Sequence, residues 1–576
     1  MKALSLVVTA VLLGGMFQIA MTLFGARIAG WIWGDGEQSQ QRELRQLTGL
    51  MMGCIVYAVL AGVAMALWPA AVRYLLWAVL AYVIADGRYT VQVIRQQWRG
   101  MLLSLLYGLT CFTILLGYEY GTSRGENIFW SIYKLAAITP GDAPQGLFQA
   151  QFLHYGHSLL GLRDFSIFDR PFLGGVVSQA ALSAVGLAPG QQFNEYPADT
   201  AYAYVALWTW LNAAIVPAVL ALGRHLAKGD TLWTGCMLLL LSPCLVLNTL
   251  GTWPKLFAVA MSVCAALMAW EGRWKWAILL SGFAFYFHGS FLWSHLALSA
   301  VLALYILLSQ QSIARRWWMV AGLILFAAAF PFMWFLAQHI SNVASPLKAY
   351  YLYGVPVNAA FTQSMEEIAR NFYRSTTPQN LAILPFINFL KSILPHEVLL
   401  WLLSFSYVGT SDVFGNFETA LFYTQVNRPL FAFGLASGAM VCIGIRRHVG
   451  SSWALSLALI AFFLLPLVPG MGLYRRDDHF ILGIMLFALI PVVIAFFLAL
   501  RDMSPRRQAG MATLILIEYA ILYGSRYKGV HYDGHFFEYY MLAVMPMLAV
   551  AWLLIMRRLA PWRGREITSK PRNAHG

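Results

Sequence analysis

Long runs of apolar residues recur along the chain, and each run is apolar on every face of the helix that it would form. Two examples are residues 207–222, LWTWLNAAIVPAVLAL, and residues 479–500, HFILGIMLFALIPVVIAFFLAL. A water-soluble helix keeps one polar face, whereas a helix that crosses a bilayer needs roughly 20 apolar residues. The pattern therefore predicts an all-α fold, a polytopic transmembrane helical bundle of about 13 to 15 helices.

Two long polar stretches interrupt these runs, at residues 119–200 and 338–429. The first is punctuated by Gly and Pro, and its segments 126–138 and 144–156 have the composition of short surface helices. The second mixes Tyr, Lys, Arg and Glu with an apolar piece, residues 386–409, which we expect to associate with the membrane. The chain then divides into N-terminal transmembrane helices (1–118), a first external loop (119–200), transmembrane helices (201–337), a second external loop (338–429), C-terminal transmembrane helices (430–556) and a basic cytoplasmic tail (557–576).

Charged residues make up 11% of the 576-residue chain, and the formal net charge is +14. Lys and Arg concentrate in short loops and in the tail. This is how membrane proteins set their orientation, so the charge does not indicate a nucleic-acid partner. We expect the basic loops on the cytoplasmic side and the two large loops outside. The basic segments are residues 86–100, 223–230, 271–276, 309–318, 445–450, 501–510 and 557–576.

The six cysteines all lie within apolar segments, and no two form a CxxC pair. This pattern predicts small core residues and gives no sign of a disulfide framework or a zinc site. The residues are Cys54, Cys111, Cys236, Cys244, Cys264 and Cys442.

Acidic and basic residues gather in the first external loop. Asp142 follows a Pro-Gly pair and precedes a predicted short helix, and Asp164, Asp169 and Arg170 follow in the same stretch. An Asp at this place can simply cap the helix. A carboxylate at the outer membrane surface, faced by arginine, also suits proton abstraction from a hydroxyl near an anionic group. The residues alone leave both interpretations of Asp142 open.

Four short motifs follow one another in the chain: PGDAPQGLFQ (140–149), DRPFLGG (169–175), TWPKLFAVAMSVCAALMAW (252–270) and FYFHGSFLW (285–293). In order and spacing they resemble motifs of the GT-C glycosyltransferases, polytopic enzymes that use a polyprenyl-phosphate sugar donor. This family includes the protein O-mannosyltransferases, the aminoarabinose transferase of lipid A and the mycobacterial arabinosyltransferases. The resemblance covers at most residues 119–300.

By this resemblance, Asp142 is the general base that activates the acceptor hydroxyl, and Lys255 lies at the external membrane surface, where a lipid phosphate reaches it. The family's Asp is often followed by a second acid, whereas Ala143 follows it here. This departure weakens a mechanism that needs a metal between adjacent acids, and Asp169 or Asp164 becomes the candidate second carboxylate. We therefore assign no cofactor and no metal ligand, while a divalent metal stays open.

Later external segments add basic residues to the side of Asp142. Such residues usually anchor membrane helices at the interface, but an excess of positive charge outside is what a phosphate pocket requires. His531 and His535, with Asp533 between them, have the spacing of two metal ligands, although Gly534 favours a loop. The candidate phosphate ligands are Lys255, Arg170, Arg475, Arg476, Arg526 and Lys528, and the other candidate pocket residues are His288, Tyr350 and Tyr351.

The resemblance implies an inverting glycosyltransferase. A hexosyl or pentosyl group would pass from a polyprenyl-phosphate-linked donor to a hydroxyl of a glycan, lipid or protein acceptor, while residues 338–429 close over the site. We expect the enzyme in the bacterial inner membrane, with its site facing the periplasm. Two alternatives stay open: an O-antigen-type polymerase or ligase with a diphosphate-linked donor, and a lipid or glycan transporter, which would show broken helices in paired halves.

Overall fold

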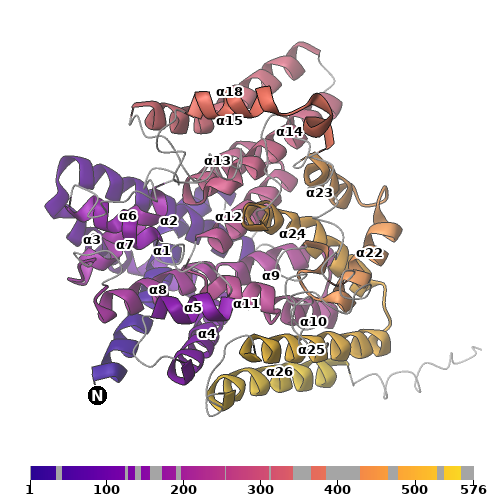
Figure 1. Ribbon diagram of the computed structural model, residues 1–576, viewed down its shortest axis with the longest axis horizontal. Coiled ribbons are helices and arrows are strands. Elements are labelled where there is room, and N and C mark those ends of the chain that lie inside the picture. The colour runs from indigo at the N-terminus through magenta and orange to yellow at the C-terminus, as the bar shows by residue number, and fades with distance from the viewer. Residues whose placement is uncertain are drawn as a thin grey trace, which may run out of the picture.

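The computed structural model of the chain consists of helices and the turns that connect them, with no strand in the part of the chain that it describes (Figure 1). The described residues are 2–33, 42–122, 128–136, 145–155, 172–189, 196–252, 254–309, 313–340, 365–383, 398, 429–464, 478–528 and 537–559.

The described helices vary widely in length, from single 3-10 turns to more than thirty residues. The first part of the chain forms α1 (Lys2–Trp33), α2 (Arg42–Leu67), η1 (Pro69–Ala71), α3 (Val72–Ala85), α4 (Gly87–Thr122), α5 (Ile128–Ala136), α6 (Gln145–Tyr155), α7 (Leu173–Ala184), α8 (Ala198–Asn212), α9 (Ile215–Leu226), α10 (Gly229–Leu240) and α11 (Pro243–Leu250). The second part forms α12 (Lys255–Trp270), α13 (Trp274–Phe287), η3 (Gly289–Phe291), α14 (Leu292–Ser309), α15 (Ile313–Ile340), α18 (Met365–Ser375), η4 (Pro429–Phe431), α22 (Leu435–His448), α23 (Trp453–Leu464), α24 (Asp478–Arg501), α25 (Pro505–Lys528) and α26 (Phe537–Leu559).

Several of these helices are long and apolar enough to cross a membrane. Among the described residues there are 6 such spans, or 7 if the bent pair α10–α11 counts as one. These spans make the chain an integral membrane protein. The predicted total of about 13 to 15 helices stays a prediction, because several apolar segments lie outside the described residues. The spans are Leu6–Trp33, Arg42–Leu67, Gly87–Glu119, Ala198–Leu226, Arg316–Met333 and Met541–Leu559.

The bend of 55° between α10 and α11 has a local cause. Pro243 cannot continue the hydrogen-bond ladder of α10, so a new helix begins there, with Pro at a first-turn position where no N–H is needed. The Ser242 hydroxyl accepts a hydrogen bond from the backbone N–H of Leu245 at 3.3 Å and caps this start. The chain therefore changes direction within the bundle.

The centre of the bundle is formed by α8 and α9, whose most apolar window is buried throughout. Trp208 and Trp210 are two of the largest side chains with almost no exposed surface. Beside them, α1 and α2 cross closely over glycines. A β-carbon on Gly25 would lie 2.0 Å from the carbonyl oxygen of Gly49, and one on Gly53 would lie equally close to the backbone of α1. Small residues at helix crossings are typical of membrane bundles, where close backbone packing replaces the hydrophobic effect.

Five of the seven basic segments predicted to be cytoplasmic meet, together with the first turn of α2, at one end of the bundle, which we call the basic end. It comprises the residues around 42–46, 95–100, 224–231, 271–273, 446–453 and 501–508. Three ion pairs and one ring contact join these segments: Arg224–Glu43 at 2.6 Å, His225–Glu271 at 3.0 Å, His448–Asp502 at 2.8 Å, and Trp270–Trp453 with ring centroids 5.0 Å apart. The alternation of basic loops in the sequence thus corresponds to one shared end in space.

The first large loop folds onto the bundle. Its two predicted short helices are confirmed as α5 and α6, and a third helix, α7, follows after Phe172. Leu147 of α6 and Val177 of α7 have no exposed surface. A stretch that the charge pattern predicts to be a polar external loop therefore contributes apolar side chains to the core.

The cysteine prediction is confirmed for five of the six residues, which are buried and unbridged. Cys442 is the exception. It lies on α22 between buried Val441 and exposed Ile443, so it faces outward. Its apolar surroundings in the sequence come from a lipid-facing helix surface, which has the same composition as a core.

Candidate functional site

Three helices that begin next to candidate residues start close together in space: α6, α7 and α12. We call this place the helix-start site. α6 begins three positions after Asp142, α7 begins three positions after Arg170, and α12 begins at Lys255 itself. Each start presents backbone N–H groups and the positive end of a helix dipole. Contacts among the described residues hold these starts together.

Tyr204 of α8 joins the starts of α6 and α12. Its hydroxyl donates a hydrogen bond to the carbonyl oxygen of Thr252 at 3.3 Å, three positions before Lys255. The hydroxyl oxygen of Tyr204 also accepts hydrogen bonds from the backbone N–H groups of Gly146 and Leu147 in the first turn of α6. A β-carbon on Gly146 would lie 2.6 Å from this oxygen, so the first turn comes this close because that residue is glycine.

The glycine pair of the DRPFLGG motif serves helix packing. A β-carbon on Gly175 would lie 2.3 Å from Cβ of Gln149 on α6, and one on Gly174 would lie 3.5 Å from Pro254. One turn later, the indole N–H of Trp208 donates to the hydroxyl of Ser178 at 3.0 Å. Gly175 is thus needed for the close approach of α7 to α6, whereas Gly174 lies in ordinary van der Waals contact with Pro254 and Trp208.

Asn212, at the end of α8, fixes the start of α12 from the other side. Its side-chain oxygen accepts from the backbone N–H of Phe257 at 3.0 Å, and its side-chain nitrogen donates to the carbonyl of Thr249 at 3.3 Å. One amide therefore satisfies groups on both sides of the turn between α11 and α12. This removes the cost of leaving them unpaired in an apolar interior.

Lys255 is buried, with 5% of its surface exposed. That it lies at the external membrane surface stays a prediction. α12 has 16 residues and spans about 24 Å, which is less than the apolar thickness of a bilayer. An ammonium group at the first position of a helix adds to the positive end of the dipole. The result is a buried centre of positive charge that favours an anion.

His288 belongs to the same end of the bundle. It follows Phe287, whose ring centroid lies 5.0 Å from that of Phe257 in the first turn of α12. The imidazole is half-buried, and its ring meets that of Phe291 edge-on with centroids 6.1 Å apart. The structure therefore places His288 and Lys255 on neighbouring helix ends.

Most other predicted site residues lie outside the described part of the chain. These are Asp142, Asp164, Asp169, Arg170, Tyr350, Tyr351, Arg475 and Arg476, together with the His531–His535 segment. Arg526 and Lys528 lie in the last turns of α25, after Tyr523, whose hydroxyl donates to Leu241 at the bend between α10 and α11. Within the described residues, no three His, Cys, Asp or Glu side chains form a group that could hold a metal ion.

Glu119 is a buried acid that the sequence motifs do not single out. It lies near the end of α4 with 7% of its surface exposed, and the hydroxyl of Tyr202 on α8 donates a hydrogen bond to it. An acidic residue between two tyrosines at the end of an apolar run is the available sequence signal. Glu119 is thus a further carboxyl group at the end of α4 that leads into the first large loop.

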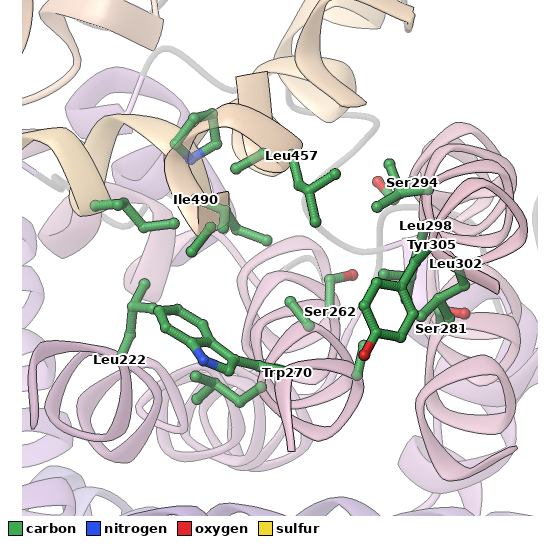
Figure 2. A pocket seen from close by; sticks show the side chains of 18 of the residues that line it. Leu222, Ser262, Trp270, Ser281, Ser294, Leu298, Leu302, Tyr305, Leu457 and Ile490 are labelled. Atoms are coloured by element: carbon green, nitrogen blue, oxygen red, sulfur yellow. The ribbon is translucent and has the colours of Figure 1, made fainter. Parts of the chain in front are cut away.

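An apolar cavity of about 480 Å³ runs beside α12, further from its start (Figure 2). Figure 2 shows Leu222 and Trp270 on one side, Ser294 and Tyr305 on another, and Ile490 across from them. Ser262, Ala266 and Ala269 of α12 line it, and their spacing of three and four residues places them on one helix face. The cavity extends to Trp270 and Trp453 at the basic end.

The chain matches no known protein-family profile, no curated protein and no solved structure.

Proposed function

We propose that the chain is a GT-C-like glycosyltransferase that takes a sugar from a polyprenyl-phosphate donor and transfers it to a hydroxyl acceptor on the external side of the membrane. One observation carries this proposal: the starts of α6 and α7 pack next to Thr252 and Pro254, directly before the buried Lys255 that begins α12. An anion is favoured there by a full positive charge and by three helix dipoles. The motifs with Asp142 and Arg170 directly precede two of these three helices.

In this proposal, Lys255 and Arg170 hold the donor phosphate, and Asp142 accepts the proton of the acceptor hydroxyl. The acceptor oxygen forms a new bond to the anomeric carbon, while the bond from that carbon to the phosphate oxygen breaks. Polyprenyl phosphate leaves with the bonding electron pair, and the sugar ends in the inverted configuration. Stabilising the leaving phosphate by fixed positive charge in a water-poor site lowers the barrier.

The apolar cavity offers a place for the polyprenyl chain. Ser262 lies seven residues after Lys255 on α12, a distance of about 10 Å along the helix. A lipid whose phosphate lies at the helix-start site can extend its chain along α12 into this cavity. The same helix would thus hold the charged head of the donor and line the pocket for its tail.

A transporter of an anionic lipid is the second candidate, because one observation favours it. The bend of 55° between α10 and α11 is a broken span inside the bundle, and α11 leads toward Lys255. Transporters place anion sites at the ends of such broken helices. The two candidates differ in outcome, since a transferase changes the donor covalently and a transporter only moves it.

The experiment is a transfer assay with the purified full chain in nanodiscs. A panel of polyprenyl-phosphate sugars is offered with membrane glycan extracts, and released polyprenyl phosphate is measured. We expect turnover of at least one donor, and a loss of about 100-fold or more in Asp142→Asn and in Lys255→Met. Matched controls are Asp199→Asn in the first turn of α8 and Lys275→Met at the basic end, both exposed residues.

Three outcomes contradict parts of the proposal. If no donor is turned over but lipid moves between leaflets, the chain is a transporter. If only diphosphate-linked donors react, the polymerase or ligase alternative is correct. If a donor reacts and Asp142→Asn is as active as the native protein at equal membrane level, the base assignment is wrong, and Glu119 is the next carboxyl group to test.

A further inference from the structure

A second cavity, which is polar and measures about 220 Å³, lies at the basic end, and its lining shares no residue with the helix-start site. It is enclosed by the first turns of α2, the basic part of α4, the end of α9 and the start of α10. We call it the arginine pocket. Its polar lining consists of Arg42, Glu43, Gln46, Arg95, Gln96, Gln97, Arg99 and Arg224.

The charges of the arginine pocket do not cancel. Four arginines and a single glutamate line it, and the glutamate is already bound by Arg224 at 2.6 Å. Arg99 lies over the ring of Trp98, with its guanidinium carbon 5.4 Å from the centroid. Within the described residues, neither Arg42 nor Arg95 forms an ion pair, nor does Arg99. A surplus of three positive charges therefore faces one small cavity.

A buried side chain points to a ligand independently of these charges. Gln97 is 8% exposed, lines the pocket, and has a side-chain oxygen with no hydrogen-bond partner among the described residues. A rotation of the terminal amide group by about 180° exchanges its oxygen and nitrogen, so that its N–H groups face the pocket instead. Leaving an amide unsatisfied in a buried place costs free energy, which an additional bound group would relieve.

The neighbouring surface of α4 locates the pocket at the membrane boundary. Val91, Ile94, Trp98 and Leu102 are exposed large apolar residues spaced three or four apart, so they form one lipid-facing stripe. Arg95 and Arg99 alternate with this stripe along the same helix. A group bound between them would lie where lipid headgroups lie.

We propose that the arginine pocket binds a phosphate group. Several planar guanidinium groups around one cavity match the several oxygens of a phosphate, whereas one arginine is enough for a carboxylate. The phosphate belongs either to an anionic membrane lipid in the leaflet at the basic end or to a free phosphate in the adjoining solution. This proposal does not depend on the proposed glycosyl transfer, because it concerns other residues at the other end of the bundle.

The test uses the purified full chain in neutral detergent, stripped of lipid, with the thermal unfolding midpoint as readout. The added probes are dioctanoyl phosphatidylglycerol, sodium phosphate at constant ionic strength, and dioctanoylglycerol, which has the same chains without phosphate. The pocket variant is Arg95→Gln/Arg99→Gln. The control is Arg446→Gln/Arg447→Gln, which removes two exposed arginines from the basic end outside the pocket.

We expect phosphatidylglycerol, sodium phosphate or both to raise the midpoint of the native chain, and dioctanoylglycerol to leave it unchanged. The apparent Kd should weaken about tenfold or more in the pocket variant and stay the same in the control. A response to phosphatidylglycerol alone identifies a lipid headgroup, and a response to phosphate alone identifies a soluble ligand. If the double variant does not fold, Arg42→Gln replaces it.

Other results would overturn the proposal. If none of the probes shifts the midpoint, the pocket binds no phosphate. If both double variants lose the response equally, the effect is general charge attraction at the basic end. If dioctanoylglycerol stabilises as well as phosphatidylglycerol, the chains are bound and the headgroup is not.

Discussion

Two helix starts in the apolar bundle solve the same electrostatic problem in opposite ways. The C-terminal ends of α12 and α22 both lie near the contact of Trp270 with Trp453. From these ends, α12 extends about 24 Å and α22 about 21 Å back to its first residue. At α22, the carboxylate of Glu518 from α25 accepts hydrogen bonds from the backbone N–H groups of Leu435 and Ala436. At α12, the first residue is the buried cation Lys255.

This difference separates a structural helix start from one suited to a ligand. A helix start carries partial positive charge, which an anion stabilises. The chain supplies that anion itself at α22, so the carboxylate of Glu518 is used in holding two helices together. At α12 the amide of Asn212 provides neutral hydrogen bonds, and Lys255 increases the positive charge. The comparison therefore teaches that, of these two helix starts, α22 has a carboxylate of the chain at its N–H groups, whereas α12 has a cation and a neutral amide.

The largest expected effect comes from removing the anion at α22. Glu518→Ala leaves the N–H groups of Leu435 and Ala436 unpaired inside the bundle, which should cost about 3 kcal/mol of stability. Glu518→Gln keeps one acceptor oxygen and should cost less. The measurement is the free energy of unfolding in detergent. Glu271→Ala is the control, because this exposed acid pairs with His225 at the basic end and should cost below about 1 kcal/mol. Equal losses in both would contradict the special role of Glu518.

The next effect tests how closely the carboxylate of Glu518 approaches. Gly434, before α22, has φ +101° and ψ 166°, a region open essentially to glycine alone. A β-carbon there would also lie 2.5 Å from an oxygen of Glu518. We expect Gly434→Ala to cost about 3 kcal/mol, from backbone strain and crowding together.

The two contributions at Gly434 can be separated. Gly450→Ala has a similar strain at φ +89° but open space around its β-carbon, so it should cost less. In the Glu518→Ala background, Gly434→Ala should lose its crowding term, and the double mutant should be more stable than the sum of the single changes predicts. Strict additivity would mean that the carboxylate does not contact this position.

The sequence predicts the class of the fold and the position of its basic loops well, because these follow from local composition. Apolar runs identify membrane helices, and α5 and α6 are visible as short segments between Gly and Pro residues. The partner of Glu518 is not predictable in this way. It lies 83 positions away, and which helix start meets a mid-helix acid depends on the packing of α22 against α25.

The candidate site is predictable only in part for the same reason. The motifs identify Lys255 and His288, which the structure places on neighbouring helix ends. The start of α12, where Lys255 is buried, is fixed by Asn212 and Tyr204, which come from another helix. Gly175 belongs to the DRPFLGG motif, and the neighbour that its missing β-carbon admits is Gln149 of α6. Contacts between distant segments have no local signature.

A smaller effect is expected from weakening the neutral cap of α12. Asn212→Ala removes the acceptor of the Phe257 N–H and the donor to Thr249, and should cost about 1 to 2 kcal/mol. Asn248→Ala is the matched control, since its side chain donates within its own helix to Cys244 and should cost less. The free energy of unfolding again decides. If the two changes cost the same, Asn212 does not connect α8 with α12 as described.

The smallest effect is a pH dependence at the contact of α6 with α7. Nδ1 of His154 lies 2.7 Å from the side-chain nitrogen of Gln179, an arrangement in which the neutral imidazole accepts the amide N–H. Partial burial lowers the pKa of His154 below its ordinary value of 6.5. The unfolded chain therefore binds this proton more readily, so the stabilisation is complete above that value and is lost as the pH falls through the lower, folded pKa.

Between about pH 7.5 and about pH 5, His154→Gln should lose less stability than the native chain. Ser183→Ala, which removes a hydrogen bond of Gln179 but keeps the imidazole, should retain the native pH dependence. A parallel change in all three proteins would place the titrating group elsewhere.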